Sequence, residues 1–119
     1  MRKISLIVPC YNEEEALPIF YEEVAKVSAS MPEYEFEFLF VDDGSKDRTL
    51  ELLQEISARD ERVFYYSFSR NFGKEAAMYA GFCNARGDYV AVMDADMQDP
   101  PSLLPEMVEA LESGEYDSV

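Results

Sequence analysis

Short apolar runs and amphipathic stretches alternate along this chain, which predicts strands and helices in turn. The apolar runs predict strands at residues 3–9, 36–41, 63–68 and 89–93. Helical spacing of apolar residues predicts helices at 14–30, 49–59 and 75–84, and a fourth with Asp99 as N-cap, Pro100 as first residue and Gly114 at its end. Residues 116–119 resemble the opening of a fifth strand. This order predicts an α/β fold in which right-handed crossovers build a mostly parallel sheet with helices on both faces.

Each polar loop of this pattern follows a strand. The loops come after Pro9, Val41, Phe68 and Met93. Because the carboxyl ends of parallel strands meet at one edge of an open sheet, where ligands bind, we expect these loops to form one site. Its candidate residues are the polar side chains of the four loops: Tyr11, Asn12, Glu13, Asp42, Asp43, Arg70, Asn71, Lys74, Asp94, Asp96 and Gln98.

Composition narrows the ligands that this edge could hold. With 119 residues, the chain forms one domain or part of one, and its net charge of −15 disfavours nucleic acid and anionic membranes as partners. Cys10 and Cys83 are far apart, so we interpret them as buried thiols in a reducing compartment. Without histidine, a bound metal would have oxygen ligands, which points to Mg²⁺ or Mn²⁺. No apolar run is long enough for a signal peptide or a membrane span, so we expect a cytoplasmic, soluble chain.

The candidate residues suit a nucleotide diphosphate. Tyr11 offers a flat face to a base, and Asp42 or Asp43 can accept hydrogen bonds from a nucleobase or a ribose. Arg70 and Lys74 flank Gly73 at the start of a helix, a suitable place for phosphate. Asp96, together with Gln98, could hold a divalent cation that bridges two phosphates.

Each of these groups also has a plainer interpretation. The stretch from Asp42 to Ser45 could be only a turn, with Ser45 or Asp47 as a helix cap, and Tyr11 could be a packing residue. Arg70 could pair with a neighbouring acid. No glycine-rich phosphate loop is present, so carboxylates and a metal would have to hold the nucleotide.

Four motifs resemble, in order and spacing, those of the family 2 glycosyltransferases, which have the GT-A fold. The third and fourth motifs are most similar to the branch that charges polyprenyl phosphates, which includes dolichyl-phosphate mannose synthase and the bactoprenol glucosyltransferases. The resemblance covers nearly the whole chain. The motifs are Val8-Pro9-Cys10-Tyr11-Asn12-Glu13, Val41-Asp42-Asp43-Gly44-Ser45 with Asp47 and Thr49, Ser69-Arg70-Asn71-Phe72-Gly73-Lys74, and Asp94-Ala95-Asp96-Met97-Gln98-Asp99-Pro100-Pro101.

The resemblance implies roles for individual residues. The nucleoside would be bound by Pro9, Tyr11, Glu13 and one or both of Asp42 and Asp43, and Asn12 is counted with these donor-binding residues. Mg²⁺ or Mn²⁺ and the diphosphate would be surrounded by Asp94, Asp96 and Gln98, with Asp94 and Asp96 as the catalytic pair. Near the donor phosphates or sugar would lie Arg70 and Lys74.

The resemblance also implies an activity: inverting, metal-dependent transfer of a sugar from a nucleotide-diphosphate sugar, with UDP favoured over GDP, to a polyprenyl phosphate or a glycan. Residues 1–119 would then be the N-terminal, nucleotide-binding half of a GT-A domain, truncated at its C-terminus and with little or no activity alone. The full-length protein would work at the cytoplasmic face of a membrane. The alternatives are a receiver-like Mg²⁺-binding signalling domain, a nucleotidyltransferase acting on sugar phosphates, and a non-catalytic interaction domain.

Overall fold

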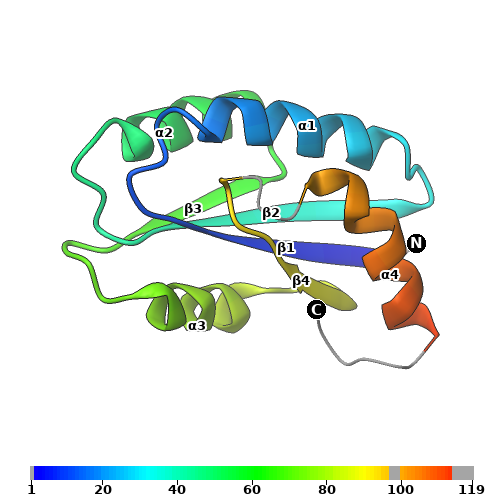
Figure 1. Ribbon diagram of the computed structural model, residues 1–119. Coiled ribbons are helices and arrows are strands. Elements are labelled where there is room, and N and C mark those ends of the chain that lie inside the picture. Colours follow the sequence, from blue (N-terminus) through cyan, green and yellow to red (C-terminus); the bar gives the residue numbers. More distant parts are fainter. Residues whose placement is uncertain (1, 97–99, 114–119) are drawn as a thin grey trace.

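The computed structural model describes residues 2–96 and 100–113, and strands and helices alternate along it (Figure 1). The elements are β1 (Arg2–Cys10), α1 (Leu17–Ala29), β2 (Tyr34–Asp42), α2 (Thr49–Arg59), β3 (Val63–Ser67), α3 (Lys74–Asn84), β4 (Tyr89–Val92), a 3₁₀ turn η1 (Pro101–Leu103) and α4 (Leu104–Glu112). None of the described helices is long and apolar enough to cross a membrane.

The described strands form one parallel sheet in the order β3-β2-β1-β4. The chain first builds outward from β1 to β3 and then returns to place β4 on the other side of β1. The strand order therefore reverses beside β1, and such a switch point opens a crevice beyond the carboxyl ends of the strands. The loops that follow β1, β2 and β3 all lie at the same end of the sheet, on the left in Figure 1.

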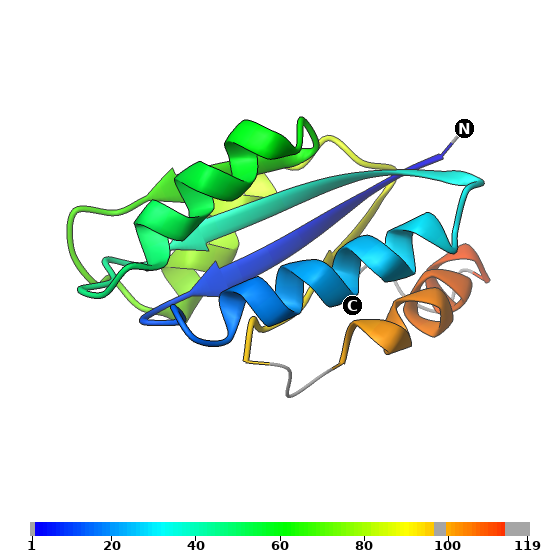
Figure 2. The same cartoon turned by 90° about the horizontal axis from the view of Figure 1, so that it is seen from above.

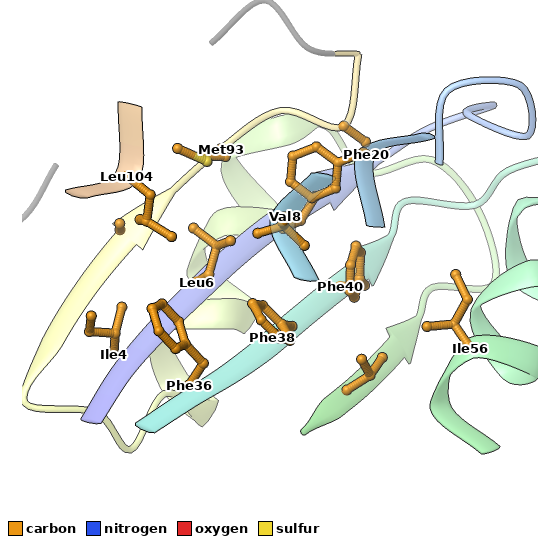
Figure 3. Packing of buried hydrophobic residues seen from close by; sticks show 14 of the residues in the cluster. Ile4, Leu6, Val8, Phe20, Phe36, Phe38, Phe40, Ile56, Met93 and Leu104 are labelled. Carbon is orange, nitrogen blue, oxygen red and sulfur yellow. The ribbon is translucent and has the colours of Figure 1, made fainter. Parts of the chain in front are cut away.

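Helices cover both faces of the sheet, which confirms the predicted α/β architecture (Figures 1 and 2). Alternate residues of β1 and β2 face α1, α2 and α4, and they form the main core with apolar residues of those helices. Figure 3 shows this cluster. Its members include Ile4, Leu6, Val8, Phe20, Phe36, Phe38, Phe40, Ile56, Met93 and Leu104.

Of the described helices, only α3 packs on the opposite face, and small residues let it approach the strands closely. Ala77 is fully buried, and a Cβ added to Gly81 would lie 2.5 Å from Ile7 Cγ2. A larger side chain at Gly81 would therefore push α3 away from β1. The contact brings the backbone of α3 close to β1.

Two predicted helix starts are displaced by local backbone chemistry. Helix α1 begins at Leu17 rather than at residue 14, after a turn in which the Leu17 N–H donates to Glu13 O (2.8 Å). Pro100 is extended (φ −65°, ψ 143°) rather than helical, because the ring of Pro101 disfavours the helical region for the residue before it. The predicted cap at Asp99, the predicted stop at Gly114 and the strand at 116–119 lie outside the described residues.

The prediction of two buried thiols is half wrong. Cys10 is buried in the main core, but Cys83 is exposed. Cys83 comes two positions after Gly81, which is about 200° around the helix, so it projects away from the sheet that Gly81 contacts.

The turn between α2 and β3 holds a carboxylate with a low pKa. Arg62 donates to Asp60 through Nε (3.0 Å) and Nη2 (2.9 Å), and Tyr21 OH donates to Asp60 Oδ2 (2.7 Å). The hydrogen bonds from Arg62, aided by the one from Tyr21, lower the pKa of Asp60 from 3.8 to about 2. The ionised form of Asp60 is therefore favoured in the folded protein.

We expect Asp60 to add acid sensitivity to the fold. Because its folded pKa lies below its unfolded one, its contribution is complete above about pH 4 and is lost as the pH falls towards 2. Urea unfolding across this range should show a smaller loss of unfolding free energy for Asp60→Asn than for the wild type. Glu61→Gln, at the exposed neighbouring residue, is the control and should keep the wild-type slope. Equal slopes for all three proteins would contradict this assignment.

Candidate functional site

A pocket of about 240 Å³ opens at the carboxyl edge of the sheet, where the strand order reverses. Residues from all four predicted loops line it. Tyr11 from the first loop and Asp96 from the fourth lie at this same pocket, so the loops meet as predicted. The lining residues are Pro9, Cys10, Tyr11, Glu13, Asp43, Lys74, Ala77, Asp94 and Asp96.

A second hollow adjoins the first across Tyr11, which lines both. It lies between the loops that follow β2 and β3, and Asp42, Arg70 and Asn71 are among its lining residues. Tyr11 is 42% exposed, so its ring remains available to a ligand rather than being a packing residue of the core. The guanidinium of Arg70 lies 4.8 Å from the centre of the Phe72 ring, a cation–π contact.

The first pocket gathers negative charge. Burial raises the pKa of Glu13, and the neighbouring charges of Asp96 and Asp94 raise it further. Burial also raises the pKa of the Cys10 thiol, and the negative charges of Glu13, Asp42 and Asp94 act in the same direction. Cys10 therefore lines the pocket as a neutral thiol and is not a nucleophile.

One positively charged side chain among the described lining residues balances part of this negative charge. Among the described residues that line the pocket, Lys74 alone is positively charged, and its Nζ lies 2.8 Å from Asp94 Oδ1 and 3.0 Å from Asp94 Oδ2. Lys74 is the first residue of α3, so the backbone of the helix start fixes where its side chain begins.

The acidic side chains fit a magnesium or manganese ion that is shared with a ligand. No three of the described acidic or cysteine side chains are arranged to hold a metal by themselves. Mg²⁺ is commonly held by one or two carboxylates and completes its shell with substrate phosphates and water. Asp94 and Asp96 supply such a pair at the pocket. The predicted third ligand, Gln98, lies outside the described residues.

The loop after β2 fastens the loop after β1 in place. Asn12 has a left-handed backbone (φ 53°); its N–H donates to Ser45 Oγ (2.8 Å), and its Oδ1 accepts from the Lys46 N–H (2.8 Å). The Glu13 N–H donates to Thr49 Oγ1 (2.8 Å). The predicted binding role of Asn12 is therefore accompanied by a structural one, because its side chain is engaged in joining the two loops.

Asp47 completes this connection. Its Oδ2 accepts from the Glu14 N–H (3.1 Å), and its Oδ1 accepts from the N–H (2.9 Å) and hydroxyl (2.5 Å) of Thr49. Desolvation opposes ionisation of Asp47, but the hydrogen bonds from Thr49 and Glu14 outweigh it and lower its pKa. Asp47 was one of two predicted helix caps, but the N-cap position of α2 is Arg48. Asp47 lies one residue earlier and sets the path of the chain next to Glu13.

The loop after β3 is held by the carboxylate of Asp43. This group accepts from the N–H of Phe72 (2.7 Å), the N–H of Gly73 (3.0 Å) and Nδ2 of Asn71 (3.0 Å). Asp43 is 4% exposed. Asp43 therefore positions the chain that leads into Lys74, in addition to lining the pocket.

Asp42 and Gly44, on either side of Asp43, have different surroundings. Asp42 accepts from the Ser45 N–H (3.1 Å) through Oδ1 and from Ser67 Oγ (3.4 Å) through Oδ2, so its contacts are fewer and longer than those of Asp43. Gly44 has φ +72°, and a Cβ there would lie 2.3 Å from the carbonyl carbon of Arg70. Only glycine lets the two loops cross so closely.

Sequence reasoning missed the fastening roles of Asp43, Asp47 and Thr49. A signal was present, since hydroxyl and carboxylate side chains cluster after β2 while the other loops carry backbone N–H groups outside any helix or strand. Deciding which side chain meets which N–H group requires the arrangement of the loops in space.

Comparisons with known proteins identify the family of this chain. The family model described as glycosyl transferase family 2 matches residues 5–119. The chain is 46% identical over 112 residues to the bactoprenol glucosyl transferase of Shigella phage SfV, which is 94% of this chain and 36% of that protein. It is 42% identical over 120 residues to the undecaprenyl-phosphate 4-deoxy-4-formamido-L-arabinose transferase of Proteus mirabilis, covering all of this chain and 36% of that protein. The chain thus spans about a third of the length of these relatives.

Solved structures share the fold. The mannosyltransferase PcManGT from Pyrobaculum calidifontis, in complex with GDP-Man and Mn²⁺, superposes with a TM-score of 0.78 at 21% identity, covering 92% of this chain and 32% of that chain. S. aureus TarS 1–349 in complex with UDP gives 0.74 at 24% identity, covering 95% of this chain and 33% of that chain. The fold is thus of the GT-A type, and the chain belongs to glycosyl transferase family 2.

Proposed function

We propose that the protein transfers a sugar, with inversion, from a nucleotide-diphosphate sugar to a polyprenyl phosphate. The observation that carries the proposal is the pocket that joins Tyr11, Lys74, Asp94 and Asp96 in a family 2 glycosyltransferase chain. It combines an aromatic face, a cation and a carboxylate pair, which are the groups that a nucleotide diphosphate with a divalent metal requires.

The donor extends across the two adjoining hollows. The base stacks on Tyr11, and Asp42, which lines the second hollow, accepts a hydrogen bond from the nucleoside. The diphosphate lies in the first pocket near Lys74. UDP is the proposed nucleotide because relatives named as bactoprenol glucosyl transferases are similar along nearly the whole chain.

The proposed catalysis depends on stabilising the negative charge that builds up on the leaving nucleotide diphosphate. Lys74 would donate hydrogen bonds to phosphate oxygens, and Asp94 and Asp96 would hold the Mg²⁺ or Mn²⁺. The metal, when bound, supplies charge neutralisation for the departing nucleotide diphosphate. A polyprenyl phosphate acceptor is already an anion, so this reaction does not require a strong general base.

The acceptor sets the proposed location. A polyprenyl phosphate is a membrane lipid, so the reaction occurs at a membrane surface. Cys10 and Cys83 are free thiols, which suits the reducing cytoplasmic side. The proposal therefore places the protein at the cytoplasmic face of a membrane.

Calorimetric titration with UDP-glucose, UDP-N-acetylglucosamine and GDP-mannose, each with and without Mn²⁺, tests the donor. We expect one of the UDP-sugars to bind, with an affinity at least about tenfold higher when Mn²⁺ is present, which corresponds to about 1.4 kcal/mol. Failure of all three to bind with Mn²⁺ would overturn the proposal. Equal affinity with and without Mn²⁺ would mean that the metal has no part in donor binding.

A further inference from the structure

The ion pair between Lys74 and Asp94 joins a residue assigned to phosphate with a residue assigned to metal. Lys74 Nζ lies within 3.0 Å of both carboxylate oxygens of Asp94. The Asp94 side chain is 25% exposed and the Lys74 side chain is 57% exposed. The ammonium group therefore occupies space beside the carboxylate oxygens that a cation would bind.

The surroundings explain why the lysine adopts this position. Glu13, Asp94 and Asp96 are close enough for their charges to interact, as the raised pKa of Glu13 shows, and Lys74 is the cation among the described lining residues. With no other positive charge among the lining residues that the structure describes, the ammonium group is drawn to the carboxylates. The start of its flexible four-carbon side chain is held by α3, while the ammonium group itself can move.

We propose that Lys74 is an exchangeable counter-ion: it neutralises Asp94 while the site is empty and moves to the diphosphate when metal and nucleotide enter. This inference rests on the proposed function, because it needs a diphosphate as the second partner of the lysine. It assigns to Lys74 a role in the unloaded protein as well as in the loaded one.

The exchange makes metal and nucleotide bind cooperatively. A divalent cation that arrives alone must displace Lys74 from Asp94 and is repelled by its charge. A diphosphate that arrives alone brings negative charge towards Glu13, Asp94 and Asp96. When both arrive, the cation takes the carboxylates and the lysine takes the phosphate, so each ligand removes the obstacle to the other. Such coupling must be reciprocal between the two ligands.

Mn²⁺ binding without any nucleotide provides a readout that is independent of activity. We expect Lys74→Met in the full chain to bind Mn²⁺ alone about 3- to 10-fold more tightly than the wild type, as judged by the electron paramagnetic resonance signal of free Mn²⁺. The same variant should bind UDP more weakly in the presence of Mn²⁺. The factor by which UDP raises Mn²⁺ affinity should therefore fall. Lys74→Arg keeps the charge and should preserve the coupling.

Lys26→Met is the matched control, because Lys26 pairs with Glu23 on α1 and does not line the pocket. It should match the wild type in every titration. An unchanged Mn²⁺ affinity and an unchanged coupling factor in Lys74→Met, with a wild type that binds Mn²⁺ and UDP together, would overturn the exchange alone. A wild type that binds no UDP or UDP-sugar with Mn²⁺ would overturn the proposed function and this inference with it.

Discussion

Asp96→Ala is expected to lower the rate of sugar transfer about 10³-fold in the full-length protein, while the fold remains intact. Asp96 is one of the two carboxylates that the pocket offers to a metal, and removing a charge-stabilising group aimed at a leaving group typically costs two to three orders of magnitude. Its side chain is exposed, so truncation creates no core cavity. Steady-state kinetics with the preferred nucleotide sugar and saturating Mn²⁺ would measure the effect.

Two controls separate chemistry from folding. Glu109→Ala removes an exposed acid on α4, away from the pocket, and should keep wild-type kinetics. Thermal unfolding of Asp96→Ala should follow the wild-type curve within about 2 °C, since surface substitutions usually change stability by less than 0.5 kcal/mol. If the variant keeps more than about a tenth of wild-type activity, Asp96 is not a metal ligand that the reaction requires.

Gly44→Ala is expected to destabilise the protein by about 3 kcal/mol or more and to weaken donor binding. The new Cβ would overlap the backbone of Arg70 at 2.3 Å and that of Asn71 at 2.5 Å, and backbone atoms cannot rotate away as a side chain can. The left-handed φ of +72° adds strain of about 1–3 kcal/mol. The loop after β3 would have to move, and with it the route into Lys74. Urea unfolding and calorimetry with the donor would measure the two effects.

Gly73→Ala is the matched control for backbone strain without overlap. Gly73 also has a positive φ, +103°, but a Cβ there meets nothing within 4 Å. The unfolding free energy of Gly73→Ala should therefore fall only by the strain of the backbone, about 1–3 kcal/mol. This loss should be smaller than that of Gly44→Ala. Equal losses in the two variants would mean that the close crossing at Gly44 contributes nothing to stability.

Apolar periodicity was sufficient to predict the fold because β1 and β2 are rich in apolar residues and are buried on both faces over most of their length. The meeting of the loops followed from topology, since parallel strands joined by helices must place their carboxyl ends together. The gathering of Tyr11, Glu13 and Asp96 at one pocket was therefore predictable without any side-chain contact.

The different contacts that neighbouring residues of the loops make were not predictable from the sequence. Asp42 and Asp43 are adjacent and chemically identical, yet Asp43 is engaged by three donors from a loop about 30 residues away. Which acid meets that loop depends on how the chain turns after β2 ends at Asp42. Cys83 was misplaced for a related reason, because α3 is rich in small residues and has only a weak apolar stripe to show which side faces the sheet.

The fastening of the loops couples donor recognition to the completion of folding. Asn12 and Glu13 depend on partners 33 to 36 residues away, and the chain before Lys74 depends on Asp43, 28 to 30 residues away. An intermediate in which β1 and β2 have paired but β3 has not docked would contain every binding residue from Tyr11 to Asp43 and still lack a formed pocket. Acquisition of nucleotide affinity during refolding should thus come no earlier than the docking of β3 and of the loop that follows it.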